Sequence, residues 1–130
     1  MHYDCVIDIE VPGTAETVLA HLTEPDLLTS WWPDGAETDP QAGGSYHLWW
    51  ESTGWHLRGT YLDVGPTRLV FTWKWDHDTI PEREVDFRIV QHGERVHLAL
   101  RHEAHDEDEC QNYEDGWTHF LGKLAKLLEA

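Results

Sequence analysis

Residues 113–128 read Tyr-Glu-Asp-Gly-Trp-Thr-His-Phe-Leu-Gly-Lys-Leu-Ala-Lys-Leu-Leu, and apolar side chains recur in this segment at steps of three and four. That spacing predicts an amphipathic helix with one broad apolar face, which we place near residues 110–129. Gly116 and Gly122 weaken it by roughly 1 kcal/mol each relative to alanine, and such glycines often permit close approach or leave space beside a packed face. The apolar face needs a second layer to cover it.

Upstream of this helix, the sequence predicts short strands separated by turns. Alternation of apolar and polar residues marks strands at 3–11, 45–51, 55–64, 68–75, 82–91 and 95–103, with a weak piece near 36–39. Between the first strand and the others, two short helices are predicted, one capped by Thr14 and one that starts at Thr23–Asp26 and runs into Trp31 and Trp32. The short connections between the later strands favour an antiparallel meander.

The pleat of each strand separates an apolar face from a largely polar one. The apolar faces combine Tyr46, Leu48 and Trp50; Trp55, Leu57, Gly59 and Tyr61; Leu69, Phe71, Trp73 and Trp75; Val85, Phe87 and Ile89; and Val96, Leu98, Leu100 and His102. A one-sided antiparallel sheet needs a cover, and the C-terminal helix is the only long one in the sequence. We therefore predict a single α+β domain over residues 1–130, a curved antiparallel sheet around a long C-terminal helix.

The composition limits the partners. Nine basic against 25 acidic residues give a net charge of −16, which repels nucleic acid and anionic membranes. No apolar run approaches the roughly 20 residues that cross a bilayer. Residues 1–5 show no basic patch followed by an apolar stretch, so we expect a cytoplasmic protein. Cys5 and Cys110 form no Cys-x-x-Cys pair, and we expect two reduced thiols.

Eight tryptophans in 130 residues predict either a wide cavity wall or an exposed aromatic face, with a core that merely uses large residues as the alternative. The ten histidines suggest no metal site. His97 and His102 point to opposite faces of their strand, and so do the neighbours His102 and Glu103. His105 lies nearby, but these residues do not have the spacing of a known metal-binding motif. We expect no metal and no cofactor.

No nucleophile elbow, phosphate-binding loop or dinucleotide fingerprint is present, and we assign no catalytic residue. If the domain were an enzyme, the candidate acids and bases would be His102 on the inward face and Glu51 or Asp63 near strand ends. The simpler interpretation of His102 is a histidine at the rim of the core whose hydrogen bonds are satisfied.

Ordered pieces of the chain are similar to a known family. They are Leu22-Thr23-Glu24-Pro25 followed by Trp31-Trp32, Gly43-Gly44-Ser45-Tyr46, Gly59, Pro66-Thr67-Arg68-Leu69-Val70-Phe71-Thr72-Trp73, Val96-His97-Leu98-Ala99-Leu100-Arg101-His102, and Gly116-Trp117. Together they resemble the heat-shock protein 90 ATPase activator homologue-like domains of the START-like (SRPBCC) superfamily. The resemblance implies the helix-grip (START-like, Bet v 1-like) fold with a cavity under the C-terminal helix. Related domains include hydrophobic-ligand carriers, polyketide cyclase-like enzymes and a co-chaperone.

Three functions stay open at this point. The first is a binding module for a small apolar or aromatic molecule, the second a polyketide cyclase- or dehydratase-like enzyme using the same pocket, and the third a co-chaperone-type domain that binds a protein through Trp31 and Trp32. We predict that the ligand-binding residues are Tyr46, Leu48, Trp50, Tyr61, Phe71, Trp73, Phe87, Leu98, Leu100, His102, Trp117 and Phe120. The sequence leaves the oligomeric state open.

Overall fold

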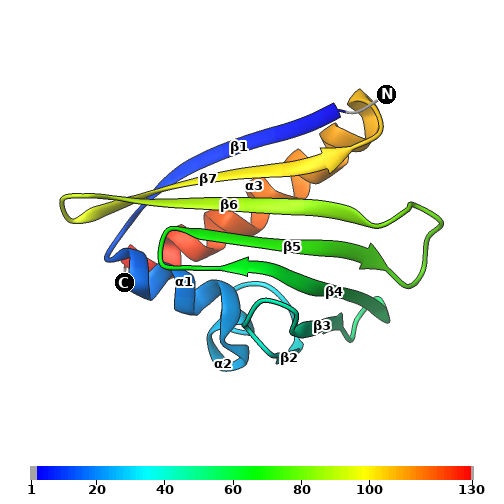
Figure 1. The fold of residues 1–130 in the computed structure, drawn as a ribbon, viewed down its shortest axis with the longest axis horizontal. Coiled ribbons are helices and arrows are strands. Elements are labelled where there is room, and N and C mark those ends of the chain that lie inside the picture. Colours follow the sequence, from blue (N-terminus) through cyan, green and yellow to red (C-terminus); the bar gives the residue numbers. More distant parts are fainter. Residues whose placement is uncertain (1–2, 130) are drawn as a thin grey trace.

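A curved antiparallel sheet covers one long helix in the computed structural model, which describes residues 3–129 (Figure 1). The strands are β1 (Tyr3–Pro12), β2 (Gly35–Thr38), β3 (Ser45–Trp50), β4 (Trp55–Val64), β5 (Arg68–Trp75), β6 (Arg83–His92) and β7 (Arg95–Ala104). The helices are α1 (Ala15–Thr23), α2 (Pro25–Leu28) and α3 (Glu107–Glu129). The predicted helix-grip fold is confirmed, with strand ends shifted by only one or two residues.

Strand order in the sheet follows the meander that the short turns predicted. The seven strands lie in the order β1-β7-β6-β5-β4-β3-β2, and every neighbouring pair is antiparallel. Only β1 leaves the sequential order, because the chain passes through α1 and α2 at one end of the sheet before β2 begins. Figure 1 shows α3 crossing behind the sheet, with its first turn beside the start of β1.

The sheet bends around the helix at β4. The register between β4 and β5 shifts between Tyr61 and Asp63, and such a bulge increases the local twist. Gly59 permits a close approach at the same place, since a Cβ there would overlap the carbonyl oxygen of Thr72. That carbonyl also accepts a hydrogen bond from the Tyr46 hydroxyl at 2.5 Å.

Local sequence explains where the helices begin. Thr14 caps α1 by accepting a hydrogen bond from the Thr17 amide at 3.1 Å. Pro25 occupies the first turn of α2, where its missing N–H costs nothing. Asp106 accepts from the Glu109 amide at 2.9 Å before the acidic first turn of α3. No helix within residues 3–129 is both long and apolar enough to span a membrane.

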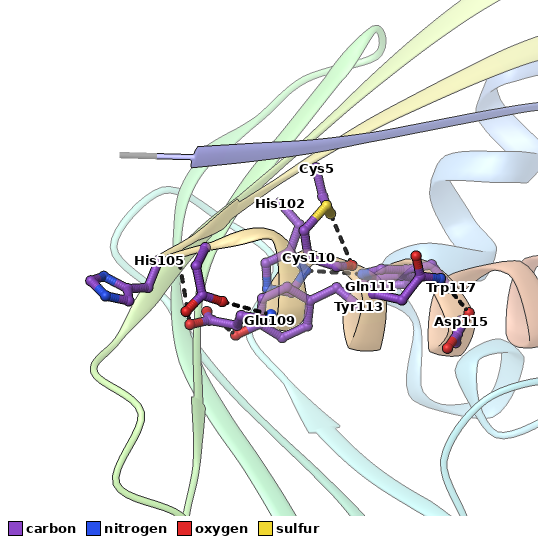
Figure 2. The surroundings of a disulfide bond; sticks show 10 residues. Cys5, His102, His105, Glu109, Cys110, Gln111, Tyr113, Asp115 and Trp117 are labelled. Carbon is purple, nitrogen blue, oxygen red and sulfur yellow. Dashed lines mark hydrogen bonds between the residues drawn. A yellow bond between two sulfur atoms is a disulfide. The ribbon is translucent and has the colours of Figure 1, made fainter. Parts of the chain in front are cut away.

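Cys5 and Cys110 form a disulfide, so the prediction of two reduced thiols was wrong. The bond joins the edge strand β1 to the first turns of α3, with the two Cα atoms 5.4 Å apart (Figure 2). A separation of 105 residues gives the sequence no sign of this pairing. The proximity arises only when β1 pairs along the whole of β7 and α3 then turns back beneath it.

Candidate functional site

The main cavity of the described chain lies between α3 and the strands β3 to β5. Its volume is about 540 Å³. The wall consists of Trp32, Trp50, Thr53, Trp55, Trp73, Trp75, His77, Asp78, Ile80, Asn112, Tyr113, Gly116, Trp117 and Phe120. Six of the eight tryptophans of the sequence are in this wall. The abundance of tryptophan is therefore explained by a cavity wall.

The wall residues on β5 and α3 are placed by the periodicity of those elements. On β5, Trp73 and Trp75 are two residues apart and so share a face. On α3, positions 113, 116, 117 and 120 form one stripe at helical spacing. Gly116 lies in this stripe, and a Cβ built there meets no atom within 4 Å. The glycine therefore leaves open space on the helix side of the cavity.

Ring contacts hold the tryptophans in place. The Trp32 ring stacks on Trp73 at 5.9 Å between centroids and lies 5.0 Å from Trp117. The Trp50 indole donates from Nε1 to the Trp32 carbonyl at 3.1 Å. At the outer end of the cavity, Trp55 contacts Trp75 edge-on at 5.7 Å. This network preorganises the wall, because each ring is held in place by its neighbours.

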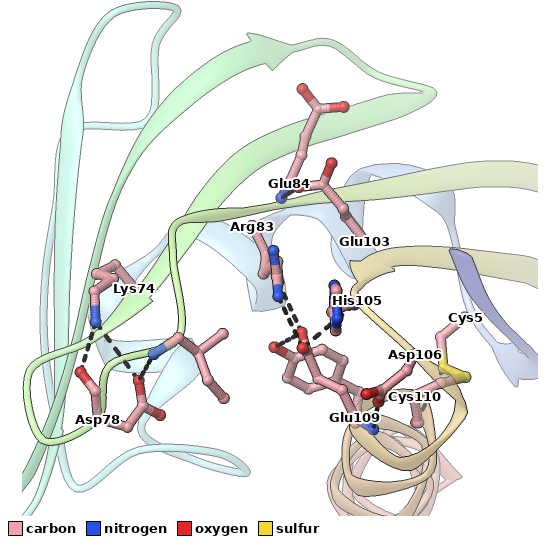
Figure 3. Close-up of polar contacts among 12 residues, drawn as sticks. Cys5, Lys74, Asp78, Arg83, Glu84, Glu103, His105, Asp106, Glu109 and Cys110 are labelled. Atoms are coloured by element: carbon pink, nitrogen blue, oxygen red, sulfur yellow. Dashed lines mark hydrogen bonds and ion pairs between the residues drawn. A yellow bond between two sulfur atoms is a disulfide. The ribbon is translucent and has the colours of Figure 1, made fainter. Parts of the chain in front are cut away.

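The polar part of the wall is small and contains no lysine or arginine. Asp78 lies in the turn after β5, and its Oδ1 atom accepts from the Ile80 amide at 3.1 Å. Lys74 pairs with the same oxygen at 3.5 Å and donates to the Asp78 carbonyl at 2.9 Å (Figure 3). Lys74 stands between Trp73 and Trp75 on β5, so its side chain leaves the strand on the opposite face from the cavity.

His102 is fully buried behind this wall and does not line the cavity. Its Nδ1 accepts a hydrogen bond from Trp117 Nε1 at 3.0 Å, and its ring stacks on Tyr113 at 3.7 Å. The neutral ring therefore carries its proton on Nε2, which has no partner among the described residues, and the buried Trp73 Nε1 has none either. Burial lowers the pKa of His102 to about 3. We predicted a histidine whose hydrogen bonds are satisfied, but only one of the two ring nitrogens of His102 has a partner among the described residues.

An ion pair fixes the start of α3 next to the cavity. Arg83 of β6 binds Glu109 through two hydrogen bonds of 2.7 and 2.8 Å (Figure 3). The Tyr113 hydroxyl donates to the same carboxylate at 2.7 Å. Burial raises the pKa of Glu109, but the hydrogen bonds from Arg83 and Tyr113 outweigh burial and leave the pKa below its ordinary value. Burial raises the pKa of Tyr113, and its bond to Glu109 adds to that rise.

The structure divides the twelve predicted ligand-binding residues into three groups. The main cavity brings together Trp50, Trp73, Trp117 and Phe120. A second cavity of only about 10 Å³ is lined by Tyr46, Leu48, Tyr61 and Phe71, with Leu22, Leu28 and Trp32. The other four predicted residues are buried but line neither cavity: Phe87, Leu98, Leu100 and His102. Residues of the last group pack beneath α3 as core.

Sequence reasoning missed ten residues of the main wall. Trp55 and Trp75 were assigned to the inward faces, and Tyr113 and Gly116 belong to the helical stripe, so strand and helix periodicity could have found them. The remaining six are Trp32, Thr53, His77, Asp78, Ile80 and Asn112. Most of these lie in connections, whose path no periodicity predicts.

Trp31 and Trp32 do not form the exposed pair that a protein partner would need. Trp31 is 4% exposed and donates from Nε1 to the His21 carbonyl at 2.9 Å. Trp32 is partly buried and faces the main cavity. The two rings stack on each other at 5.6 Å. Among residues 3–129, no three histidine, cysteine or acidic side chains converge as a metal site.

A curved antiparallel sheet closed by a C-terminal helix over an aromatic cavity defines a helix-grip domain of the SRPBCC type. The chain belongs to the Activator of Hsp90 ATPase homolog 1-like protein family, whose model matches residues 12–129. No curated protein sequence gives a significant match.

Solved structures share this fold at low sequence identity. A protein of Mesorhizobium loti superposes with a TM-score of 0.85 at 23% identity, covering 98% of this chain and 97% of the other. The Aha1 dimer from Colwellia psychrerythraea superposes with a TM-score of 0.84 at 17% identity, covering 98% of this chain and 96% of the other. DynU16, from the dynemicin biosynthetic locus, superposes with a TM-score of 0.86 at 22% identity. The match covers 98% of this chain but only 47% of DynU16. At such identities the likeness concerns the fold alone.

Proposed function

We propose that this domain binds a small, largely apolar or aromatic molecule in the cavity between α3 and the strands β3 to β5. The observation that carries the proposal is the cavity itself, about 540 Å³ with a mostly aromatic wall. Binding sites for small molecules usually have 300–1,000 Å³ and a few polar groups among apolar ones. Protein interiors are otherwise close-packed, so a space of this size bordered by six indoles is not a packing accident.

Gly116 gives this proposal a sharp test. Gly116→Phe would place a ring in the open space at the cavity wall, and we expect it to abolish or strongly weaken binding of the neutral dye N-phenyl-1-naphthylamine, measured by fluorescence titration. Stability should not fall, because phenylalanine is a better helix former than glycine by several tenths of a kcal/mol. Denaturant melts on the same samples check this.

Gly122→Phe is the matched control. Gly122 also lies in α3, and a Cβ there also meets no atom within 4 Å, but Gly122 is outside the cavity wall. This variant should bind the dye like the wild type. Equal binding by Gly116→Phe and the wild type, or a wild type that binds no dye, would contradict the proposed function.

A polyketide cyclase- or dehydratase-like reaction in the same cavity is the second candidate. It is favoured by the titratable side chains of the wall, His77, Asp78 and Tyr113, and by the origin of DynU16 in the dynemicin biosynthetic locus. His102 does not suit this role, because it lies outside the cavity and its low pKa makes it a poor base. Native mass spectrometry of freshly purified protein would distinguish a retained ligand from a released product.

A further inference from the structure

Electrostatics of the cavity favour one class of ligand. We propose that the cavity selects an organic cation, an ammonium group joined to an apolar body, over an anion of the same shape. This inference rests on the proposed ligand-binding function and adds the sign of the ligand's charge. Three independent features of the wall support it.

The first feature is the angle between the rings at the outer end of the cavity. Trp50 and Trp75 lie 5.3 Å apart at 49°, and Trp75 and Trp55 lie 5.7 Å apart at 67°. Rings tilted in this way present their faces in different directions, and one face of Trp55 is covered by the His77 ring, whose centroid lies 4.5 Å away. The electron-rich face of an indole attracts a cation more strongly than that of any other aromatic side chain. The three indoles thus resemble an aromatic cage.

The second feature is the charge of the wall. Asp78 is the only acidic residue that lines it, and no lysine or arginine lines it, although Lys74 pairs with the Asp78 carboxylate from the opposite face of β5. The Oδ1 atom of Asp78 accepts a hydrogen bond from the Ile80 amide and pairs with Lys74. Lys74 itself is held at the turn by hydrogen bonds to the carbonyls of Trp75 and Asp78 at 2.7 and 2.9 Å.

The third feature is that no lysine or arginine among the described residues lines the cavity to pair with an anionic ligand. Arg83 lies near the cavity, but it makes two short hydrogen bonds to Glu109. The carboxylate of Glu109 therefore compensates the charge of Arg83. A buried carboxylate or sulfonate without a positive partner is costly. The net charge of −16 raises that cost further and attracts cations from solution. A fatty acid is therefore a poor ligand for this wall.

Three probes of equal shape test the inference: (2-naphthylmethyl)trimethylammonium, its neutral carbon isostere 2-neopentylnaphthalene, and the anion 2-naphthylmethanesulfonate. Each competes with N-phenyl-1-naphthylamine at low ionic strength. We expect the ammonium probe to bind about 3- to 30-fold more tightly than the neutral isostere, the range that a cation–π contact supplies. The sulfonate should not displace the dye.

Asp78→Asn should weaken binding of the ammonium probe several-fold more than binding of the neutral probe, because it removes the charge while the amide oxygen can still accept from the Ile80 amide. Asp8→Asn is the matched control, since it changes the net charge equally but lies exposed on β1, at the opposite edge of the sheet. Ammonium binding no tighter than neutral binding, or displacement by the sulfonate, would overturn the inference while leaving the proposed function. Failure of the dye itself to bind would remove both.

Discussion

At the scale of single residues, His102 is an ionisable side chain that is fully buried. Its pKa of about 3 lies below the ordinary 6.5 because burial disfavours the charged ring. The unfolded chain therefore binds a proton at a higher pH than the folded protein does. The resulting stability is fully present above pH 6.5 and falls as the pH drops from 6.5 toward 3, by up to about 1.4 kcal/mol per pH unit.

We expect His102→Gln to reduce the free energy of unfolding at pH 7.5 and to make it depend less on pH between 7.5 and 5.5 than in the wild type. Urea melts at several pH values measure both effects. His97→Gln on the other face of β7 is the control, and it should keep the slope of the wild type because His97 is partly exposed. Parallel pH profiles for His102→Gln and the wild type would show that His102 is not buried in its neutral form.

At the scale of elements, the disulfide between β1 and α3 joins the edge of the sheet to its cover. Closing a loop of this length restricts the unfolded chain, and such bonds typically add about 2–4 kcal/mol to stability. We expect a reducing agent, or the pair of substitutions Cys5→Ser and Cys110→Ser, to lower the melting temperature by several degrees. Intact mass with and without reductant checks the bond itself.

The same bond bears on the expected cytoplasmic location. Disulfides are rare in the reducing cytosol, so the disulfide in the structure conflicts with the cytoplasmic location expected from the sequence. Trapping free thiols with iodoacetamide immediately on cell lysis would show whether the two cysteines are free or disulfide-bonded in the cell. Two alkylated cysteines in protein that is folded and purified without reductant would contradict the disulfide.

At the scale of the whole molecule, the net charge of −16 acts on every element together. Repulsion among the acids destabilises the compact state most at low ionic strength, where screening is weak. We expect the melting temperature to rise as sodium chloride increases over the first few hundred millimolar, measured by differential scanning fluorimetry. Sucrose at equal osmolality separates charge screening from a general solute effect. A flat response to salt would mean that the acids are already well paired or well separated.

The order of elements and the direction of their side chains were predictable because both depend on local rules. The alternation in β5 placed Trp73 on the inner face, and the three- and four-residue steps of α3 placed Trp117 and Phe120 opposite it. The same rules could not tell a cavity wall from a packed core. Phe87 and Leu98 obey the periodicity as well as Trp73 does, yet they lie outside the cavity.

By itself, then, the sequence determined an antiparallel sheet covered by a C-terminal helix, the inward faces and the net charge, since these follow from residue type and spacing along the chain. Only the tertiary structure decided which apolar residues surround open space. It also paired Cys5 with Cys110 and brought the turn containing Asp78 beside α3. These features depend on distances between segments far apart in the sequence, set by the bend of the sheet and the path of α3, and no local pattern records such distances.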